Sequence, residues 1–172
     1  MTMKKNLLLR AGLAGASALA AVAATMTPAS AATSYESDTC TSSGNAYCFA
    51  AYFSSRGTQT WYSTSACHVV NRDIPDWYGY SPNGAILVRY IFRARMITGR
   101  YNTCIETGGD GQGAKNNMAS GSNGECSATY RVYYSSGHNG LSQAFLPTCG
   151  DYWPAENLVD VLKNENASLD RY

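Results

Sequence analysis

The sequence predicts an all-β domain that is cross-linked by disulfides. Three observations predict this fold class. After residue 31, the chain consists mainly of short runs rich in aromatic and β-branched residues, separated by Gly, Ser and Asn. All six cysteines lie in this part of the chain, and one pattern of aromatic run, Ser/Gly turn and Asn-containing phrase occurs twice. The 172 residues are enough for one small domain.

Residues 1–31 are a segment of a different kind. Three basic residues precede an alanine-rich apolar run, which ends in Ala29-Ser30-Ala31. A basic start, a short apolar run and a small-x-small end are typical of a secretory signal peptide cleaved after Ala31. A transmembrane anchor is the alternative, but it needs about 20 consecutive apolar residues and this run is too short. We therefore expect a secreted, extracellular protein whose mature domain is residues 32–172.

The charge of the expected mature chain excludes one class of partner. Removing the signal peptide leaves 10 of the 13 basic residues against 12 acidic residues, a net charge of −2. Such a chain lacks the positive surface of a nucleic-acid-binding protein. No later segment is long and apolar enough to span a bilayer as a helix. We expect a monomer that neither binds nucleic acid nor inserts into a membrane.

The number of cysteines is even, which in an exported chain predicts three disulfides. Of the possible pairings the sequence indicates only Cys40 with Cys48, because a short turn-rich stretch separates them. A metal site is the alternative, but the chain has no C-x-x-C and only two histidines. The six expected half-cystines are Cys40, Cys48, Cys67, Cys104, Cys126 and Cys149.

Five runs have the composition of strands. They are Tyr47–Phe53, Thr58–Tyr62, Ile86–Met96, Thr129–Tyr134 and Leu141–Phe145. In the third run apolar residues alternate with a set of three arginines and Ile91, which is the period of a half-buried strand. One helix is predicted at Pro154–Lys163, where a proline lies at the start and four apolar residues are spaced to share a face.

The third strand also predicts a basic face. Residues 77–105 contain no Asp or Glu but include Arg89, Arg93, Arg95 and Arg100. On a strand the first three share a side, where they would attract an acidic partner or a wall polymer. The alternative is a solvated strand face or a charged edge that discourages aggregation.

Two phrases recur in the same order along the chain. Tyr52-Phe53-Ser54-Ser55 is followed by Lys115-Asn116-Asn117-Met118-Ala119-Ser120. Tyr133-Tyr134-Ser135-Ser136 is followed in the same way by Lys163-Asn164-Glu165-Asn166-Ala167-Ser168. Two matches in the same order favour an internal duplication.

The two copies differ in length. Tyr52 and Asn116 are 64 positions apart, whereas Tyr133 and Asn164 are 31 apart, so the first copy carries 33 extra residues. We place repeat one at residues 40–121 with the insertion at 74–106, and repeat two at residues 129–169.

These features resemble the double Greek key of the βγ-crystallins. They are similar in particular to the secreted actinobacterial proteins of the peptidase inhibitor I36 family, named after a Streptomyces metalloproteinase inhibitor. Two stretches, Cys40–Gly57 and Gly111–Ser168, carry the resemblance, and the insertion is not covered. The resemblance implies that each copy forms a four-stranded Greek key and that the two keys pack as a sandwich. It also implies a protein that inhibits an extracellular peptidase.

The resemblance further implies an inhibitory bond next to a cysteine. The founding inhibitor uses a Cys-Val bond, and thermolysin-like enzymes favour a bulky apolar residue after the cleaved bond. This chain has no Cys-Val, and its candidates are Cys104-Ile105 in a turn-rich region and Cys48-Phe49 in a predicted strand. We expect Cys104-Ile105, because loops are presented to partners more readily than strands. The alternative is that Cys104 is a structural half-cystine and that Ile105 packs beside it.

The Asn-x-x-Ala-Ser phrases resemble the calcium motif of microbial βγ-crystallins, although both lack its final serine. Calcium takes about six to eight oxygen ligands, and only one carboxylate occurs in the two phrases, so we expect weak binding. The alternative is a turn in which the Asn and Ser side chains bond the backbone. No other cofactor is expected. The candidate ligands are Asn116, Asn117 and Ser120 in one copy, and Asn164, Glu165 and Ser168 in the other.

Sequence motifs for hydrolytic catalysis are missing. The chain contains no G-x-S-x-G and no H-E-x-x-H, and oxidised cysteines provide no nucleophile. We therefore expect a binding protein and not an enzyme. A peptidase inhibitor is the first expectation. The alternatives are a secreted cell-surface, toxin-associated or wall-polymer-binding module, and a weak calcium-binding crystallin.

Overall fold

The computed structural model describes residues 32–42, 47–58, 63–95, 104–149 and 155–172, all within the compact unit Ala31–Tyr172. Every regular element in these ranges is a strand, which confirms the all-β prediction. Among the same residues, no helix is long and apolar enough to cross a membrane. The strands form three sheets of five, three and two strands.

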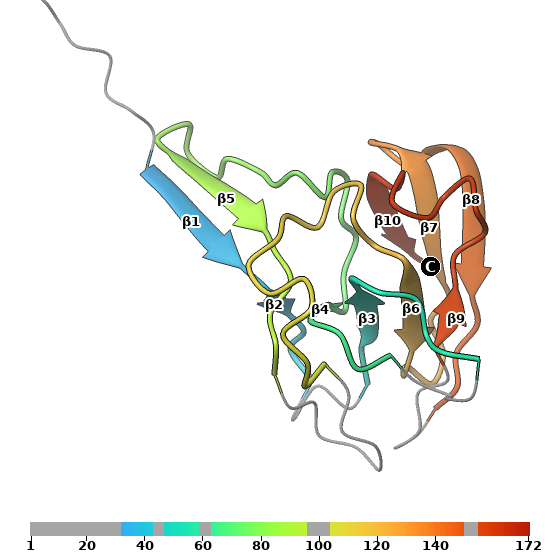
Figure 1. Ribbon diagram of the computed structural model, residues 1–172. Coiled ribbons are helices and arrows are strands. Elements are labelled where there is room, and N and C mark those ends of the chain that lie inside the picture. Colours follow the sequence, from blue (N-terminus) through green and yellow to red (C-terminus); the bar gives the residue numbers. More distant parts are fainter. Residues whose placement is uncertain (1–31, 43–46, 59–62, 96–103, 150–154) are drawn as a thin grey trace, which may run out of the picture. The chain divides into compact units, whose positions relative to one another are not determined.

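The five-stranded sheet is centred on β3 (Phe49–Tyr52). Both neighbours of β3, β4 (Cys67–Val70) and β6 (Ser120–Asn123), run antiparallel to it. β2 (Asp38–Thr39) lies parallel to β4 at one edge, and β9 (Glu156–Asn157) lies antiparallel to β6 at the other. Figure 1 shows β3 between β4 and β6.

The three-stranded sheet is centred on β7 (Tyr130–Ser135). β8 (Asn139–Phe145) and β10 (Ser168–Arg171) run antiparallel to it on either side (Figure 1). A turn at residues 136–138 joins β7 to β8, and the register between these two strands shifts between Tyr133 and Ser135.

The two larger sheets repeat the same pairing. Tyr52 lies opposite Ser120 in the first sheet, as Tyr133 lies opposite Ser168 in the second. The Ala119 amide donates to the Tyr52 carbonyl at 2.9 Å, and the Ala167 amide donates to the Tyr133 carbonyl at 2.9 Å. β3 and β6 therefore correspond to β7 and β10, as a duplicated chain requires.

Each copy also contributes backbone to the sheet of the other copy. The Trp77 amide donates to the Ala167 carbonyl at 2.8 Å, and the Leu158 amide donates to the Ala119 carbonyl at 3.0 Å. Trp77 in the first copy thus corresponds to Leu158 in the second. Next to Trp77, Ile74 forms an antiparallel bridge with Leu169, which adds a short pairing at the edge of β10.

This correspondence locates the extra residues of the first copy. Tyr52 and Trp77 are 25 positions apart, and so are Tyr133 and Leu158. The additional 33 residues must therefore lie between Trp77 and Asn116. They include β5 (Ile86–Tyr90), which pairs in parallel with β1 (Ala32–Glu36) and forms the two-stranded sheet.

Side chains of the two larger sheets meet in one hydrophobic core. Phe49 of β3 stacks on Tyr130 of β7 with ring centroids 4.9 Å apart, and its edge meets Phe145 of β8 at 5.2 Å. Tyr90 and Phe92 from the extra residues are buried in the same core. Such aromatic contacts add to the free energy gained from burying apolar surface.

The other face of β3 borders a smaller cluster that contains a disulfide. Because side chains alternate along a strand, Ala50 and Tyr52 point away from the main core, and they pack in this cluster with Cys67 and Cys104. Cys67 of β4 is bonded to Cys104, which attaches the segment between Trp77 and Asn116 to the sheet.

All six cysteines are paired. The structure joins Cys40 to Cys48, the one pair that the sequence indicated. The other two disulfides, which the sequence left open, are Cys67–Cys104 and Cys126–Cys149.

The helix predicted at Pro154–Lys163 is wrong for the part that the structure describes. Residues 155–163 contain β9 and a turn. Leu158 and Leu162 are buried, whereas Val159 and Val161 are exposed, so the four apolar side chains do not share one face. A helix this short has little stability of its own, and pairing with β6 favours extended backbone instead.

The strand predictions hold with changed boundaries. The run Ile86–Met96 is a regular strand only to Tyr90, because the backbone then changes partner and Ile91 bridges Gly113. The prediction Thr58–Tyr62 lies mostly outside the described residues, as does Met96. Tyr47–Phe53, Thr129–Tyr134 and Leu141–Phe145 correspond to β3, β7 and β8.

The buried histidine of β4 predicts a loss of stability in acid. His68 is fully buried, its Nδ1 atom lies 3.2 Å from the Ile91 carbonyl, and its ring meets the rings of Trp77 and Tyr90. Burial is the main cause that lowers the pKa of His68 from 6.5 to about 4; Arg95 and Arg72 act in the same direction, and the Ile91 carbonyl and Asp38 oppose them.

Because the folded state holds this histidine neutral, its contribution to stability is complete above pH 6.5 and falls as the pH drops towards 4. The expected loss from His68 is about 3 kcal/mol. Urea unfolding at neutral pH and below pH 4 measures it, with His68→Phe as the variant that lacks the titrating group. An equal acid loss in the wild type and the variant would contradict the assignment.

Candidate functional site

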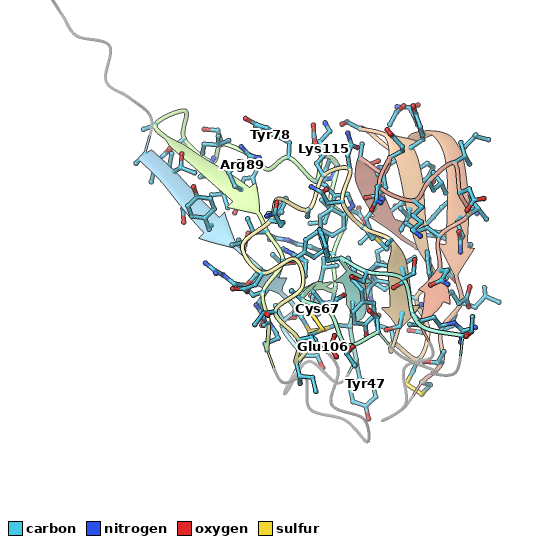
Figure 2. The ribbon with its side chains drawn as sticks, viewed as in Figure 1. Tyr47, Cys67, Tyr78, Arg89, Glu106 and Lys115 are labelled. Atoms are coloured by element: carbon cyan, nitrogen blue, oxygen red, sulfur yellow. A yellow bond between two sulfur atoms is a disulfide. The ribbon has the colours of Figure 1, made fainter. Side chains whose placement is uncertain are left out.

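The Cys104-Ile105 segment presents an apolar side chain on a fixed backbone. Cys104 is fully buried and bonded to Cys67, whereas the side chain of Ile105 is 48% exposed. The Arg95 amide donates to the Cys104 carbonyl at 2.7 Å, and the Glu106 amide donates to the Thr64 carbonyl at 2.7 Å. Figure 2 shows Glu106 close to the Cys67 disulfide. Ile105 therefore projects between two anchored neighbours.

The segment differs from an extended, substrate-like loop. Cys104 has a φ of 61°, in the left-handed region that non-glycine residues seldom adopt. Its carbonyl, which a protease would attack, is already bonded to Arg95. A partner would therefore meet the Ile105 side chain first. The alternative candidate, Cys48-Phe49, is fully buried beside and within β3 and does not reach the surface.

The two Asn-x-x-Ala-Ser phrases face each other in the fold. The Asn116 amide donates to the Asn166 carbonyl at 2.8 Å, and the Asn164 amide donates to the Met118 carbonyl at 3.0 Å. Asn116 and Asn164 both have a φ of 59°. Asparagine adopts this left-handed conformation more readily than most residues, which explains its place in both phrases.

The serines of both phrases bond backbone. The Ser120 hydroxyl donates to the Ser54 carbonyl at 2.7 Å, and the Ser168 hydroxyl donates to the Ser135 carbonyl at 2.6 Å. The Asn117 side-chain amide donates to the Gly113 carbonyl at 2.9 Å. These three candidate calcium ligands thus have structural roles in connecting each phrase to the neighbouring backbone.

Two corresponding pockets lie beside the phrases. The larger, of about 530 Å³, is called the first pocket, and its lining residues are Phe53, Ser54, Ser55, Asn117, Ala119, Lys163 and Asn164. The smaller, of about 260 Å³, is called the second pocket, and the corresponding residues that line it are Tyr134, Ser135, Ser136, Glu165, Ala167, Lys115 and Asn116. The duplication therefore produces two pockets from equivalent positions.

The second pocket contains a lysine whose charge is balanced by an ion pair. The Lys115 ammonium lies 2.9 Å from a carboxylate oxygen of Asp76 and donates to the Ser136 hydroxyl at 2.9 Å. Burial alone would raise the pKa of Asp76, but the Tyr78 amide, Lys115 and Ser136 together hold it below its usual range. Glu165 adds a second carboxylate to this pocket.

The first pocket has the lysine without the carboxylates. Asn157 occupies the position that corresponds to Asp76, and Asn117 occupies that of Glu165. No Asp or Glu is among the described lining residues, and Lys163 has no ion-pair partner in the described part of the chain. The two pockets therefore differ in charge.

The predicted basic face has intramolecular partners. Arg93 lies 3.4 Å from Asp110, and Arg95 lies 2.7 Å from Asp38. The Arg89 guanidinium lies 3.7 Å from the centre of the Tyr78 ring. Both residues are labelled in Figure 2. Arg100 lies outside the described residues.

A buried charge cluster escaped the sequence reasoning. Arg171 binds both carboxylate oxygens of buried Glu125, at 2.8 and 2.6 Å, and the Tyr130 hydroxyl also donates to Glu125. Burial, followed by the contact with Glu125, raises the pKa of Tyr130. The cluster links β10 to β7 and to the loop after β6, and no local sequence pattern indicates it.

The two pocket lysines were also missed as functional residues. Their signal was present, because Lys115 and Lys163 each begin the repeated phrase. Comparisons of this chain with protein-family models, curated proteins and solved structures found no match. The function is therefore inferred from the geometry and from the resemblance of the sequence to the I36 family.

Proposed function

We propose that this chain is a secreted peptidase inhibitor, similar to the I36 family, that binds a metalloproteinase through Ile105. The observation that carries the proposal is the half-exposed Ile105 side chain between two backbone groups that are already hydrogen-bonded. The three disulfides are compatible with an extracellular protein.

We also propose that the fold is a double Greek key of the βγ-crystallin type. The correspondence of β3 and β6 with β7 and β10 supports this assignment. So do the segments that each copy contributes to the sheet of the other, at Trp77 and Leu158. The 33 extra residues between Trp77 and Asn116 are then an insertion into the first key, and the inhibitory segment lies in this region.

The proposed mechanism is occupation of the protease by a preorganised apolar side chain. The Cys67–Cys104 disulfide and the flanking hydrogen bonds hold the backbone, so little conformational entropy is lost when Ile105 enters an apolar pocket. The Cys104 carbonyl stays bonded to Arg95 and is not presented for attack. The inhibitor would therefore block the site without rapid cleavage of the Cys104-Ile105 bond.

A panel of metallo-, serine and cysteine proteases tests the proposal. The purified protein should slow a thermolysin-type metalloproteinase at micromolar concentration. Mass spectrometry should then find the Cys104-Ile105 bond intact. If no protease of any class is inhibited, the inhibitor proposal fails. The alternative binding module then becomes the better account, with the exposed Tyr78 and Tyr80 of the insertion as its contact residues.

Weak calcium binding is a second candidate function. The second pocket fits calcium better than the first pocket does. The described residues contain no group of three or more His, Cys, Asp and Glu side chains that could hold a metal ion. The first pocket is lined by a lysine and by no described carboxylate, so it does not fit calcium. The second pocket offers Glu165 and Asn116, but a calcium ion there would compete with the Lys115 ammonium.

Removing that ammonium should therefore strengthen calcium binding. We expect Lys115→Gln to raise the calcium affinity about tenfold over the wild type, because one positive charge leaves the pocket. Calorimetry on the metal-free protein measures the affinity, with Lys163→Gln as the control for the first pocket. If neither the wild type nor Lys115→Gln binds millimolar calcium, this candidate is removed.

A further inference from the structure

We propose that the first pocket binds a tetrahedral oxyanion, either a phosphate or a sulfate group. The proposal concerns a site separate from Ile105 and does not depend on protease inhibition. It rests on the donor groups that line the pocket and on the difference between the two corresponding pockets.

Four side chains of the first pocket carry hydrogen-bond donors that have no partner among the described residues. They are the Lys163 ammonium, the hydroxyls of Ser54 and Ser55, and the Asn164 side-chain amide, none of which has a hydrogen bond to any other described residue. Other polar groups here are committed, because the Ser54 carbonyl accepts from Ser120 and the Asn117 amide donates to Gly113. The unpartnered groups are thus those available to a ligand.

In the second pocket, the lysine that corresponds to Lys163 has a partner within the protein. There the Lys115 ammonium is 2.9 Å from Asp76 and also donates to Ser136. In the first pocket the position of Asp76 is taken by Asn157, whose side-chain oxygen instead accepts from the Arg56 amide at 2.8 Å. The lysine is present in both copies, whereas the carboxylate is present in one. Within the described residues no carboxylate balances the charge of Lys163, which leaves its ammonium free to pair with a bound anion.

The number and kind of donors indicate the class of anion. The ammonium repels a metal cation, and the hydroxyl and amide groups around it can donate hydrogen bonds to negatively charged oxygen. A carboxylate presents two oxygens, whereas a phosphate or sulfate presents three or four that can meet four donors at once. The pocket volume of about 530 Å³ leaves room for the molecule that carries the anionic group.

The test is a calorimetric or NMR titration of the purified protein with inorganic phosphate, with sulfate and with acetate, at constant ionic strength. We expect phosphate or sulfate to bind at millimolar concentration and acetate to bind about tenfold more weakly. Lys163→Gln should weaken phosphate binding about tenfold, since it removes the charge-assisted contact. Lys115→Gln, the matched control in the second pocket, should leave phosphate binding unchanged.

Asn164→Gly provides a second variant that keeps the left-handed backbone, since glycine adopts a positive φ without strain. It should weaken phosphate binding while the far-ultraviolet circular dichroism stays that of the wild type. The proposal is overturned if neither phosphate nor sulfate binds, if acetate binds as tightly, or if Lys115→Gln weakens binding as much as Lys163→Gln.

Discussion

Replacing Cys67 and Cys104 together by alanine should lower the free energy of unfolding by about 4 kcal/mol. The disulfide closes a loop with a sequence separation of 37, and its loss frees that loop in the unfolded chain. Because both cysteines are fully buried, the two substitutions change the interior of the domain and not its surface. Inhibition should weaken as well, because the backbone before Ile105 loses its covalent anchor.

Urea unfolding and inhibition assays measure these two effects. The matched control is the double variant Cys126→Ala and Cys149→Ala, which opens a loop with a sequence separation of 23. It should lower stability by about 3 kcal/mol and leave inhibition unchanged in protein that remains folded. If both double variants weaken inhibition equally, the anchor role of Cys67–Cys104 is wrong.

Replacing Ile105 by aspartate should weaken inhibition at least about a hundredfold, which corresponds to about 2.7 kcal/mol of binding free energy. A carboxylate that enters an apolar pocket loses its hydration without gaining a partner. Stability should change little, because the side chain is half exposed in the free protein. Inhibition constants against a thermolysin-type metalloproteinase provide the measurement.

Two control variants show whether the loss of inhibition is specific to the change from Ile105 to aspartate. Ile105→Val keeps a branched apolar side chain and should retain inhibition within a few-fold, since one methylene changes binding modestly. Leu146→Asp alters a side chain that is 69% exposed elsewhere and should leave inhibition unchanged. Equal inhibition by wild type and Ile105→Asp would exclude Ile105 as the contact residue.

The strands were predictable where the pattern is local. Aromatic or β-branched content identifies the runs that form β7 and β8, and the repeated phrases align β3 and β6 with β7 and β10. The helix prediction failed because β9 is determined by a distant partner, β6. The sequence placed the extra residues at 74–106, but the correspondence of Trp77 with Leu158 comes from backbone pairing alone, because the two residues do not resemble each other in sequence.

The sites were predictable only in part for the same reason. The phrases pointed to Asn116 and Asn164, but the charge of the second pocket also depends on Asp76, which lies far from both phrases in sequence. Two arginines of the predicted basic face pair with Asp38 and Asp110, which lie outside the sequence window that suggested the face. Contacts between distant segments leave no local pattern in one sequence.

Hydroxyl-radical footprinting of the protein, alone and with a thermolysin-type metalloproteinase, tests the central claim most directly. Ile105, Leu141 and Leu146 are all exposed in the free protein, at 48%, 61% and 69%, and should be oxidised there. In the complex, oxidation of Ile105 should fall to background while Leu141 and Leu146 react as before. Unchanged oxidation of Ile105 at saturating protease would contradict the account.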